Sequence, residues 1–440
     1  MSSEAIGELN HLIQSAVGIR QARDSGVLLS GGVDSSLLFD IASHHSDRNL
    51  IAMTGSVKGF ADGEQEMADA KELADARHVP HESVVVDPGD ESLPDEWTLL
   101  TQSWMAGSRV TLPVFHRLAR RARNVLGEGS SVLSGQMADT LADNNYTFPS
   151  LGYTFRRAFY SPWFLTLLPL IGKLAPASDG RMGDALCAQT RRWCGPRISE
   201  MVQSVLSGVK DHRTFYQGRI FGYGEMPGRS SVYFPSLTKN GFERVADLYS
   251  AQFVAPVVSR LQPSTFYRDM LELSFDMVML HLDTRLVFHA FRLSQMRAEL
   301  PFLDSRVVNF FVSMPYSARS ILREPKHVIH AQVRNRKLKC ANANRNRKEM
   351  STQGNSADHL LLDGSLGAHF RDLLAEPEAL NQVQGIFDYI DESYAFEQMR
   401  QFRDGCSGVN AKFISRLAAL ESWQRFISNA SHLEFACARA

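Results

Sequence analysis

The sequence contains few cysteines, and they do not form the pattern that a zinc site or a disulfide framework needs. The five cysteines are Cys187, Cys194, Cys340, Cys406 and Cys437, and no two of them form a C-x-x-C pair. Structural zinc sites and disulfide-stapled domains depend on closely spaced cysteines, so the sequence argues against both classes. We therefore expect a reducing compartment and a cytoplasmic location.

The sequence also lacks a long apolar run and an excess of charge of either sign. Its most apolar stretch, residues 163–171, contains Pro169 and is too short to span a bilayer. The N-terminal residues MSSEAIGELNHLIQSAV have neither the basic start nor the apolar core of a signal peptide. A formal net charge of −1 gives no overall attraction to nucleic acid or to anionic lipid. We expect no membrane partner.

The sequence does contain enough apolar material for a large core, with 440 residues of which 44% are hydrophobic. After a lead-in helix over residues 1–20, the pattern alternates between strands and helices. Strands are expected at 27–29, 50–54, 81–86 and 131–133, and helices at 64–77 and 113–126. This alternation predicts an α/β fold with a doubly wound parallel sheet and with ligands at the carboxyl ends of its strands. We expect an α/β core over residues 1–150 and a mostly helical, substrate-binding or lid region over 151–440.

The stretch VLLSGGVDSSLL, residues 27–38, places two glycines and an aspartate between a strand and a helix. Gly31 and Gly32 allow close backbone approach, and amides at a helix start favour an anion. Further donors come from three hydroxyls, those of Ser30, Ser35 and Ser36. Asp34 would repel phosphate unless Mg²⁺ lies between them. No Walker lysine follows, and the alternative is a structural turn capped by Asp34.

This turn resembles the S-G-G-x-D-S pyrophosphate loop of the PP-loop ATP pyrophosphatases, which cleave ATP between its α and β phosphates. The resemblance implies an adenine nucleotide α-hydrolase-like fold, with ATP and Mg²⁺ as the cofactors. By family position, Leu28 and Thr54 would line the nucleotide. The loop alone does not choose among the members, which include synthetases and tRNA-modifying enzymes.

A second motif, VLSGQMAD at residues 132–139, resembles the L-S-G-E-G-[AS]-D-E motif of asparagine synthetases. The resemblance implies that Ser134 and Gly135 pack on the nucleotide. It also implies that Asp139 joins Asp34 as a carboxylate ligand of Mg²⁺, which takes few protein ligands. The alternative for Asp139 is a helix N-cap.

Two later segments match the same branch of the superfamily. Residues 299–304, ELPFLD, resemble its R-V-P-F-L-D signature, with Asp304 expected to cap the next helix. Residues 324–329, EPKHVI, lie where that branch carries K-x-x-L-R, so Lys326 would stabilise the anionic transition state. The alternative for Lys326 is a surface lysine. The chain is thus similar to the synthetase domain of asparagine synthetase, and to the β-lactam synthetase and lasso-peptide cyclase relatives.

The sequence departs from that family at two places that concern the nitrogen donor and the acceptor. Position 2 is Ser rather than the family's catalytic Cys, and the loop begins at residue 30, so we expect no N-terminal glutaminase domain. Gln136 replaces the family's Glu; it cannot act as a general base but can hydrogen-bond an acyl-adenylate or an amine. The expected substrates are therefore a small-molecule or peptide carboxylate and an amine or ammonia. A separate amidotransferase, peptide or carrier protein is a candidate partner.

These observations predict an AMP-forming carbon–nitrogen ligase, with Lys326, Asp34, Asp139 and Gln136 as its catalytic residues. Two other functions stay open. One is a tRNA- or nucleotide-modifying enzyme that uses the basic residues between 319 and 348, although these have little aromatic interleaving. The other is a degenerate homologue that binds nucleotide without turnover. The same basic stretch also fits a phosphate-facing lid or a docking surface for an acidic partner.

Overall fold

A computed structural model of the chain describes residues 3–44, 49–103, 109–143, 284–314, 326–338, 357–375, 386–405 and 409–430, with a few isolated residues between 237 and 271. The chain divides into two compact units. The first takes in the described residues within Met1–Asn10, Met137–Leu280 and Leu303–Val328. The second takes in those within His11–Gln136, His281–Phe302 and Ile329–Ala440. Three segments discussed above lie outside the described residues: the apolar stretch 163–171, the start of the EPKHVI segment at 324–325, and the basic residues 339–348.

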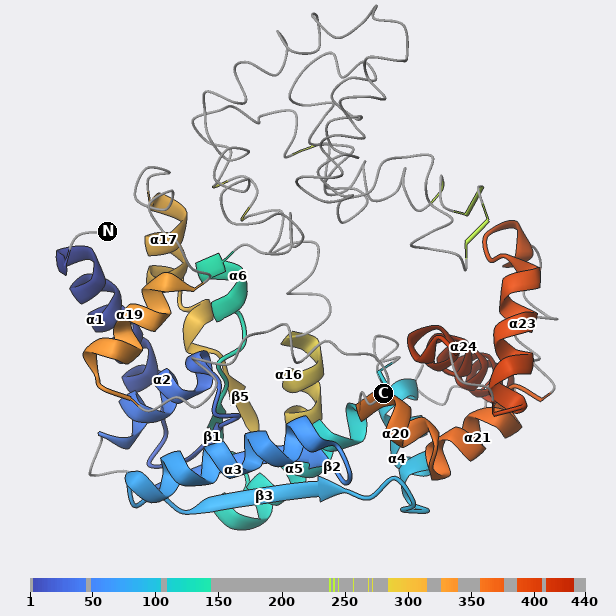
Figure 1. The fold of residues 1–440 in the computed structure, drawn as a ribbon, viewed down its shortest axis with the longest axis horizontal. Helices are drawn as coiled ribbons and strands as arrows, with labels where there is room; N and C mark the ends of the chain where they lie inside the picture. The colour runs from blue at the N-terminus through green and yellow to red at the C-terminus, as the bar shows by residue number, and fades with distance from the viewer. Residues whose placement is uncertain are drawn as a thin grey trace, which may run out of the picture. The chain divides into compact units, whose positions relative to one another are not determined.

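The second unit is built on a five-stranded, all-parallel sheet (Figure 1). Its strands are β1 (Asp24–Leu28), β2 (Asn49–Val57), β3 (His81–Val86), β4 (Ser131–Leu133) and β5 (Arg297–Glu299), in the order β3-β2-β1-β4-β5. The chain moves outward from β1 to β3 and then returns to β4 on the other side of β1. This reversal makes the gap between the carboxyl ends of β1 and β4 the topological switch point, where such folds bind ligands.

Helices cover both faces of this sheet, as two neighbouring residues of β2 show. A Cβ on Gly55 would lie 2.5 Å from Leu118 Cδ1 of α5 (Leu112–Leu126). Ser56, the next residue, contacts Gly63 of α3 (Ala61–Ala76). Successive strand residues point to opposite faces, so α3 and α5 lie on opposite sides of the sheet. The α/β, doubly wound fold class predicted from the sequence is confirmed.

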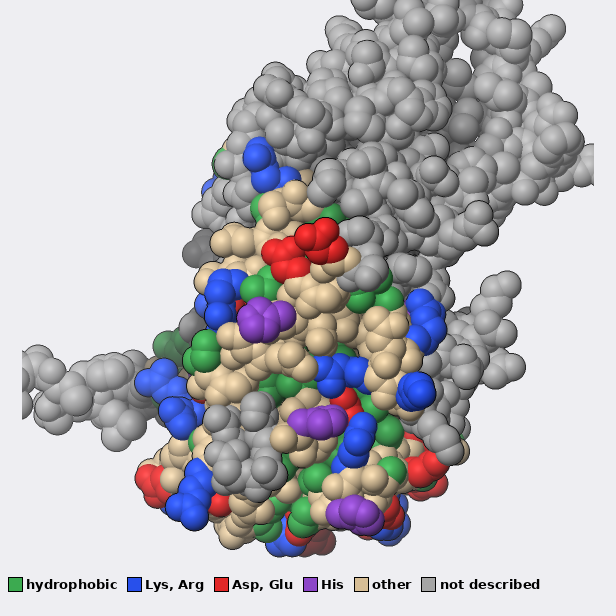
Figure 2. All heavy atoms as spheres, turned by 90° about the vertical axis from the view of Figure 1, so that its left-hand side faces the viewer, with side chains coloured by type: hydrophobic (Ala, Val, Ile, Leu, Met, Phe, Trp, Pro, Cys, Tyr) green, Lys and Arg blue, Asp and Glu red, His purple; other side chains and the backbone are tan. Residues whose placement is uncertain are grey.

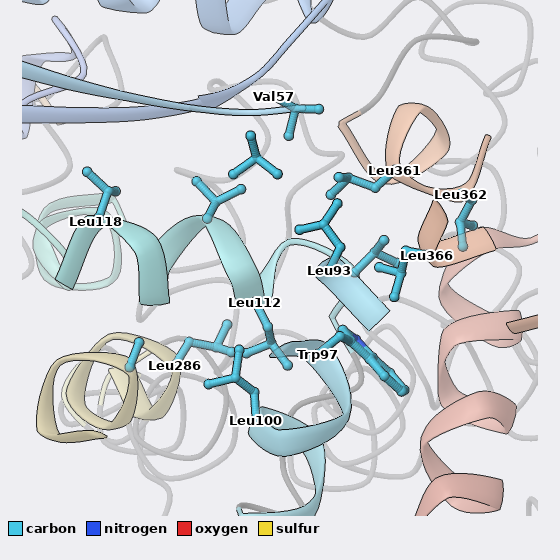
Figure 3. Packing of buried hydrophobic residues seen from close by; sticks show 14 of the residues in the cluster. Val57, Leu93, Trp97, Leu100, Leu112, Leu118, Leu286, Leu361, Leu362 and Leu366 are labelled. Carbon is cyan, nitrogen blue, oxygen red and sulfur yellow. The ribbon is translucent and has the colours of Figure 1, made fainter. Parts of the chain in front are cut away.

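The core of the second unit joins helices from distant parts of the sequence (Figure 3). Besides α5, the helices that contribute to this core are α4 (Leu93–Gln102), α16 (Thr284–Leu293), α20 (Ala357–Leu362), α21 (Ser365–Leu373), α23 (Glu392–Arg403), α24 (Ala411–Ala430) and the 3₁₀ turn η5 (Ile386–Asp388). The second unit also contains α2 (Val33–Ser43), the helix that follows the glycine turn. Trp97 of α4 is fully buried, and its ring centroid lies 4.5 Å from that of Phe370 of α21, edge to face. Aromatic pairs of this kind add about 0.5–1.5 kcal/mol beyond the area they bury. The C-terminal helices therefore belong to the core that supports the sheet.

The first unit contributes α6 (Ala138–Asp143) and α17 (Ser305–Ser313), which pack together. The 3₁₀ turn η3 (Pro301–Leu303) precedes α17, and Asp304 caps that helix by accepting a hydrogen bond from the Arg306 amide at 3.0 Å. The cap expected from the sequence is confirmed. Two helices, α1 (Ser3–Arg20) and α19 (His327–Asn335), run from one unit into the other. Within the described ranges, no helix combines the length and the apolar character that crossing a membrane needs.

Candidate nucleotide-binding site

The glycine turn lies at the carboxyl end of β1, beside the switch point. β1 ends at Leu28 and α2 begins at Val33, so Ser30, Gly31 and Gly32 fill the turn between them. The Leu29 amide donates to Met53 O at 2.9 Å, which fixes the start of the turn to β2. Gly32 is the N-cap residue of α2 and has no side chain to cap the helix. The first amides of a helix have no partners within the helix itself, so such a helix start favours an anion.

Gly31 is held in a conformation and a space that suit glycine alone. Its φ of +69° lies in the left-handed region. A Cβ at this position would lie 2.7 Å from Cβ of Asp69, a buried residue of α3. Gln65 Nε2 donates to Asp69 Oδ1 at 2.9 Å and so fixes that side chain against the turn. The sequence did not single out Asp69, because acidic residues recur along this helix and its spacing matches no motif.

The three serines of the turn have different surroundings. The Ser35 hydroxyl donates to Gly32 O at 3.1 Å and accepts from the Ser30 amide at 3.2 Å, so it shapes the turn from inside. The Ser30 hydroxyl lies 3.2 Å from it. The Ser36 side chain is 1% exposed, and its hydroxyl has no hydrogen-bond partner among the described residues. A buried hydroxyl without a partner is costly, and at Ser36, in the first turns of α2 directly after the glycine turn, an oxygen of a bound phosphate can supply that partner.

We expect Ser36→Ala to weaken ATP binding about ten- to a hundredfold, because a hydrogen bond to a charged group contributes roughly 1.5–3 kcal/mol. Thermal stability should be unchanged or slightly higher, because the substitution removes an unsatisfied buried group. Calorimetric titration with ATP and thermal unfolding measure the two effects. Ser25→Ala is the matched control: Ser25 in β1 is also fully buried with no hydroxyl partner in the described part of the chain. An equal loss of ATP affinity in both variants would contradict the assignment of Ser36.

The segment that follows β4, Ser134–Gln136, packs against this turn. A Cβ on Gly135 would lie 3.0 Å from the Ser35 amide nitrogen and 3.2 Å from the carbonyl carbon of Asp34. The Ser134 amide donates to Glu299 O at 2.9 Å, which ties the segment to β5. Oε1 of Gln136 is buried and has no hydrogen-bond partner among the described residues. The structure thus brings the two predicted motifs together and leaves a second buried polar atom for a ligand.

Thr54, expected at the nucleotide, supports the turn from β2. Its hydroxyl donates to Leu29 O and lies 3.0 Å from His81 Nε2. Because the hydroxyl proton is used toward Leu29, the imidazole must donate through Nε2. Burial lowers the pKa of His81, so the neutral ring is favoured. Leu28, the other residue expected at the nucleotide, is the half-buried last residue of β1.

Asp34 is the second residue of α2, so its carboxylate belongs to the first turn of the helix that follows the loop. Among the described residues no three His, Cys, Asp or Glu side chains gather as metal ligands. Mg²⁺ does not need such a cage, because one or two carboxylates and substrate phosphates suffice. One oxygen of Asp34 is buried at the turn, which fits this mode of binding.

The other two predicted site residues belong to the first unit. Asp139 is the second residue of α6, and its side chain lies outside the described part of the chain. Lys326 directly precedes α19 and has a φ of +53°, an uncommon backbone conformation for a lysine. Their roles at the site stay predictions.

Comparison with known proteins is consistent with this geometry. A family model described as asparagine synthase matches residues 8–425. The match includes the glycine turn, the segment after β4 and Lys326. No curated protein matches the chain significantly. The chain therefore belongs to the asparagine synthase family of ATP-dependent, amide-forming ligases.

Proposed function

We propose that the chain adenylates a substrate carboxylate with Mg²⁺-ATP and then joins the acyl group to an amine or ammonia. A carboxylate oxygen attacks the α-phosphorus of ATP, which forms an acyl-adenylate and releases pyrophosphate. The nitrogen then attacks the acyl carbon, loses a proton, and displaces AMP. The observation that carries this proposal is the Ser36 hydroxyl, which is buried and has no partner among the described residues, just after a glycine turn that leads into a helix start.

In this reaction the turn binds the leaving pyrophosphate. The amides at the start of α2 and the Ser36 hydroxyl donate to its oxygens, while Ser35 keeps the turn in shape together with Ser30, Gly31 and Gly32. Leu28, Thr54, Ser134 and Gly135 line the nucleotide. Asp34 and Asp139 would hold Mg²⁺, which when bound neutralises phosphate charge. Lys326 balances the remaining negative charge.

Gln136 acts on the acceptor side of the reaction. Its buried Oε1 can accept a hydrogen bond from an amine N–H, but it carries no charge and so lacks the electrostatic attraction that a carboxylate would offer an ammonium ion. This fits an amine substrate, or ammonia delivered by a separate amidotransferase, better than glutamine-dependent asparagine synthesis. We place the enzyme in specialised or peptide biosynthesis, with a small-molecule or peptide carboxylate as the acyl donor.

The charges on the face shown in Figure 2 do not favour a nucleic-acid-modifying role. Figure 2 shows carboxylates beside Lys and Arg side chains on the face that it displays. Phosphate backbones bind to continuous basic patches, and mixed charge weakens such binding. This face therefore lends no support to an RNA-modifying enzyme, whereas the family match over residues 8–425 supports an amide-forming ligase.

Magnesium-dependent exchange of labelled pyrophosphate into ATP tests the proposal. The assay is run with fractionated pools of amino acids, small carboxylates and peptides, with and without Mg²⁺. Exchange that requires both Mg²⁺ and one carboxylate fraction is the expected result. ATP binding with neither exchange nor AMP formation, even with carboxylate and amine pools combined, would indicate a non-catalytic homologue.

A further inference from the structure

A buried carboxylate on the loop helix joins the C-terminal ends of two other helices. Asp40 of α2 is 1% exposed. Its Oδ2 accepts from Arg336 Nη1 at 2.7 Å, and its Oδ1 accepts from Arg77. Arg77 is the C-cap residue of α3, and Arg336 directly follows α19. A buried charge is stable only when it is paired and hydrogen-bonded, so Asp40 requires these partners.

Asp40 lies close to the candidate phosphate site. Ser36 and Asp40 are four residues apart on α2, so their side chains share one face of the helix, with Cβ atoms about 5–6 Å apart. The Arg336 guanidinium is therefore anchored one helical turn from the buried Ser36 hydroxyl. In Figure 1 this places the C-terminal end of α19 beside α2.

Backbone hydrogen bonds close the C-terminal end of α19. Lys337 has a φ of +55°. Its amide donates to Arg334 O at 3.0 Å, and the Leu338 amide donates to Val333 O at 3.1 Å. These bonds form a Schellman motif in which Lys337 takes the left-handed position. Arg336 is then the C-cap residue of α19, so fixing its guanidinium fixes the helix end.

We propose that Arg336, through Asp40, is a positioning residue for adenylation. The pair holds α19 to the helix that begins at the phosphate-binding turn. Lys326 directly precedes α19, whose nine residues span about 13 Å. The pair thereby fixes the C-terminal end of the helix that Lys326 directly precedes. This inference rests on the proposed function, in which Lys326 balances charge during adenylation.

Substituting the two arginines one at a time tests the inference. Arg336→Gln and Arg77→Gln each remove one of the two guanidinium groups that bind Asp40, and the new glutamine amide can still donate a hydrogen bond to it. Only Arg336→Gln removes the ion pair between Asp40 and the end of α19. For Arg336→Gln we expect kcat for pyrophosphate exchange to fall roughly ten- to a hundredfold. Its Kd for ATP should change less than about threefold, because the turn is intact. Arg77→Gln should change neither value. Arg336→Lys, which retains a cation beside Asp40, should restore part of the rate.

Hydrogen exchange of the backbone amides in α19 supplies a readout that does not need activity. Arg336→Gln should speed exchange over residues 329–335 about tenfold or more, and Arg77→Gln should not, because local opening governs exchange. The inference would be overturned if Arg336→Gln and Arg77→Gln had equal effects. It would also be overturned if neither Arg336→Gln nor Arg336→Lys changed kcat or the hydrogen exchange of α19. If the wild-type chain forms no AMP, the proposed function is refuted instead. The hydrogen-exchange data would still decide whether Arg336 holds α19.

Discussion

Asp34→Asn is expected to reduce the rate of AMP formation about a thousandfold. This is the upper end of the range for removing one group that stabilises transition-state charge. The amide has the shape of the carboxylate but lacks its charge, so it cannot hold Mg²⁺ against the phosphates. Single-turnover formation of AMP from labelled ATP measures the loss. A second readout is the Mg²⁺ dependence of ATP binding, which should largely disappear.

The matched control is Asp62→Asn. Asp62 is an exposed residue in the first turn of α3, so it has the same relation to its helix dipole as Asp34 has to that of α2. Each substitution removes about 0.3–1 kcal/mol of helix stabilisation. Only Asp34→Asn should affect the reaction. Retained AMP formation in Asp34→Asn, with unchanged Mg²⁺ dependence, would remove Asp34 from the site.

Gly31→Ala is expected to weaken ATP binding about a hundredfold and to lower stability. The new alanine would have to keep the left-handed backbone conformation of Gly31. Its Cβ would lie 2.7 Å from Asp69 Cβ, a distance that folded proteins avoid. The left-handed backbone alone costs about 1–2 kcal/mol. The clash adds to this and moves the turn, whose amides must point at the phosphates. Calorimetric titration with ATP and denaturant unfolding measure the two losses.

Gly129→Ala separates the backbone cost from the clash. Gly129 has a φ of +76°, and a Cβ there would meet nothing within 4 Å among the described residues. It precedes β4, at the opposite end of that strand from the Ser134 segment. This variant should lose about 1–2 kcal/mol of stability and keep its ATP affinity. If Gly31→Ala lost no more affinity than Gly129→Ala, the contact between the turn and α3 would not shape the site.

Much of the sheet could be predicted from the sequence, because buried parallel strands appear as short apolar runs. The four expected strands match β1 to β4, and the helix expected at 113–126 matches α5 (Leu112–Leu126). β5 was missed because Arg297–Glu299 contains two charged residues and has no apolar pattern. It joins the sheet through pairing with β4, a contact that local sequence does not encode.

At the site, the sequence identified the residues of the two motifs but not which contacts each of their side chains makes. The turn and the Ser134–Gln136 segment were both expected at the nucleotide, and the structure packs them so closely that a Cβ on Gly135 would lie 3.0 Å from the Ser35 amide nitrogen. Three features depend on three-dimensional geometry: the hydrogen bonds of Ser35 inside the turn, the Ser36 hydroxyl that has no partner among the described residues, and the closeness of Asp69 to Gly31. Asp40 was missed for the same reason, because its partners lie 37 and 296 residues away in the sequence.

The measurement that tests the central claim most directly is the fate of the carboxylate oxygen. The carboxylate identified by pyrophosphate exchange is labelled with ¹⁸O and turned over once with ATP, Mg²⁺ and the amine, and the products are analysed by mass spectrometry. Adenylation predicts AMP that carries one ¹⁸O atom, together with unlabelled pyrophosphate. Unlabelled AMP, or ADP with phosphate, would contradict an acyl-adenylate formed at the glycine turn.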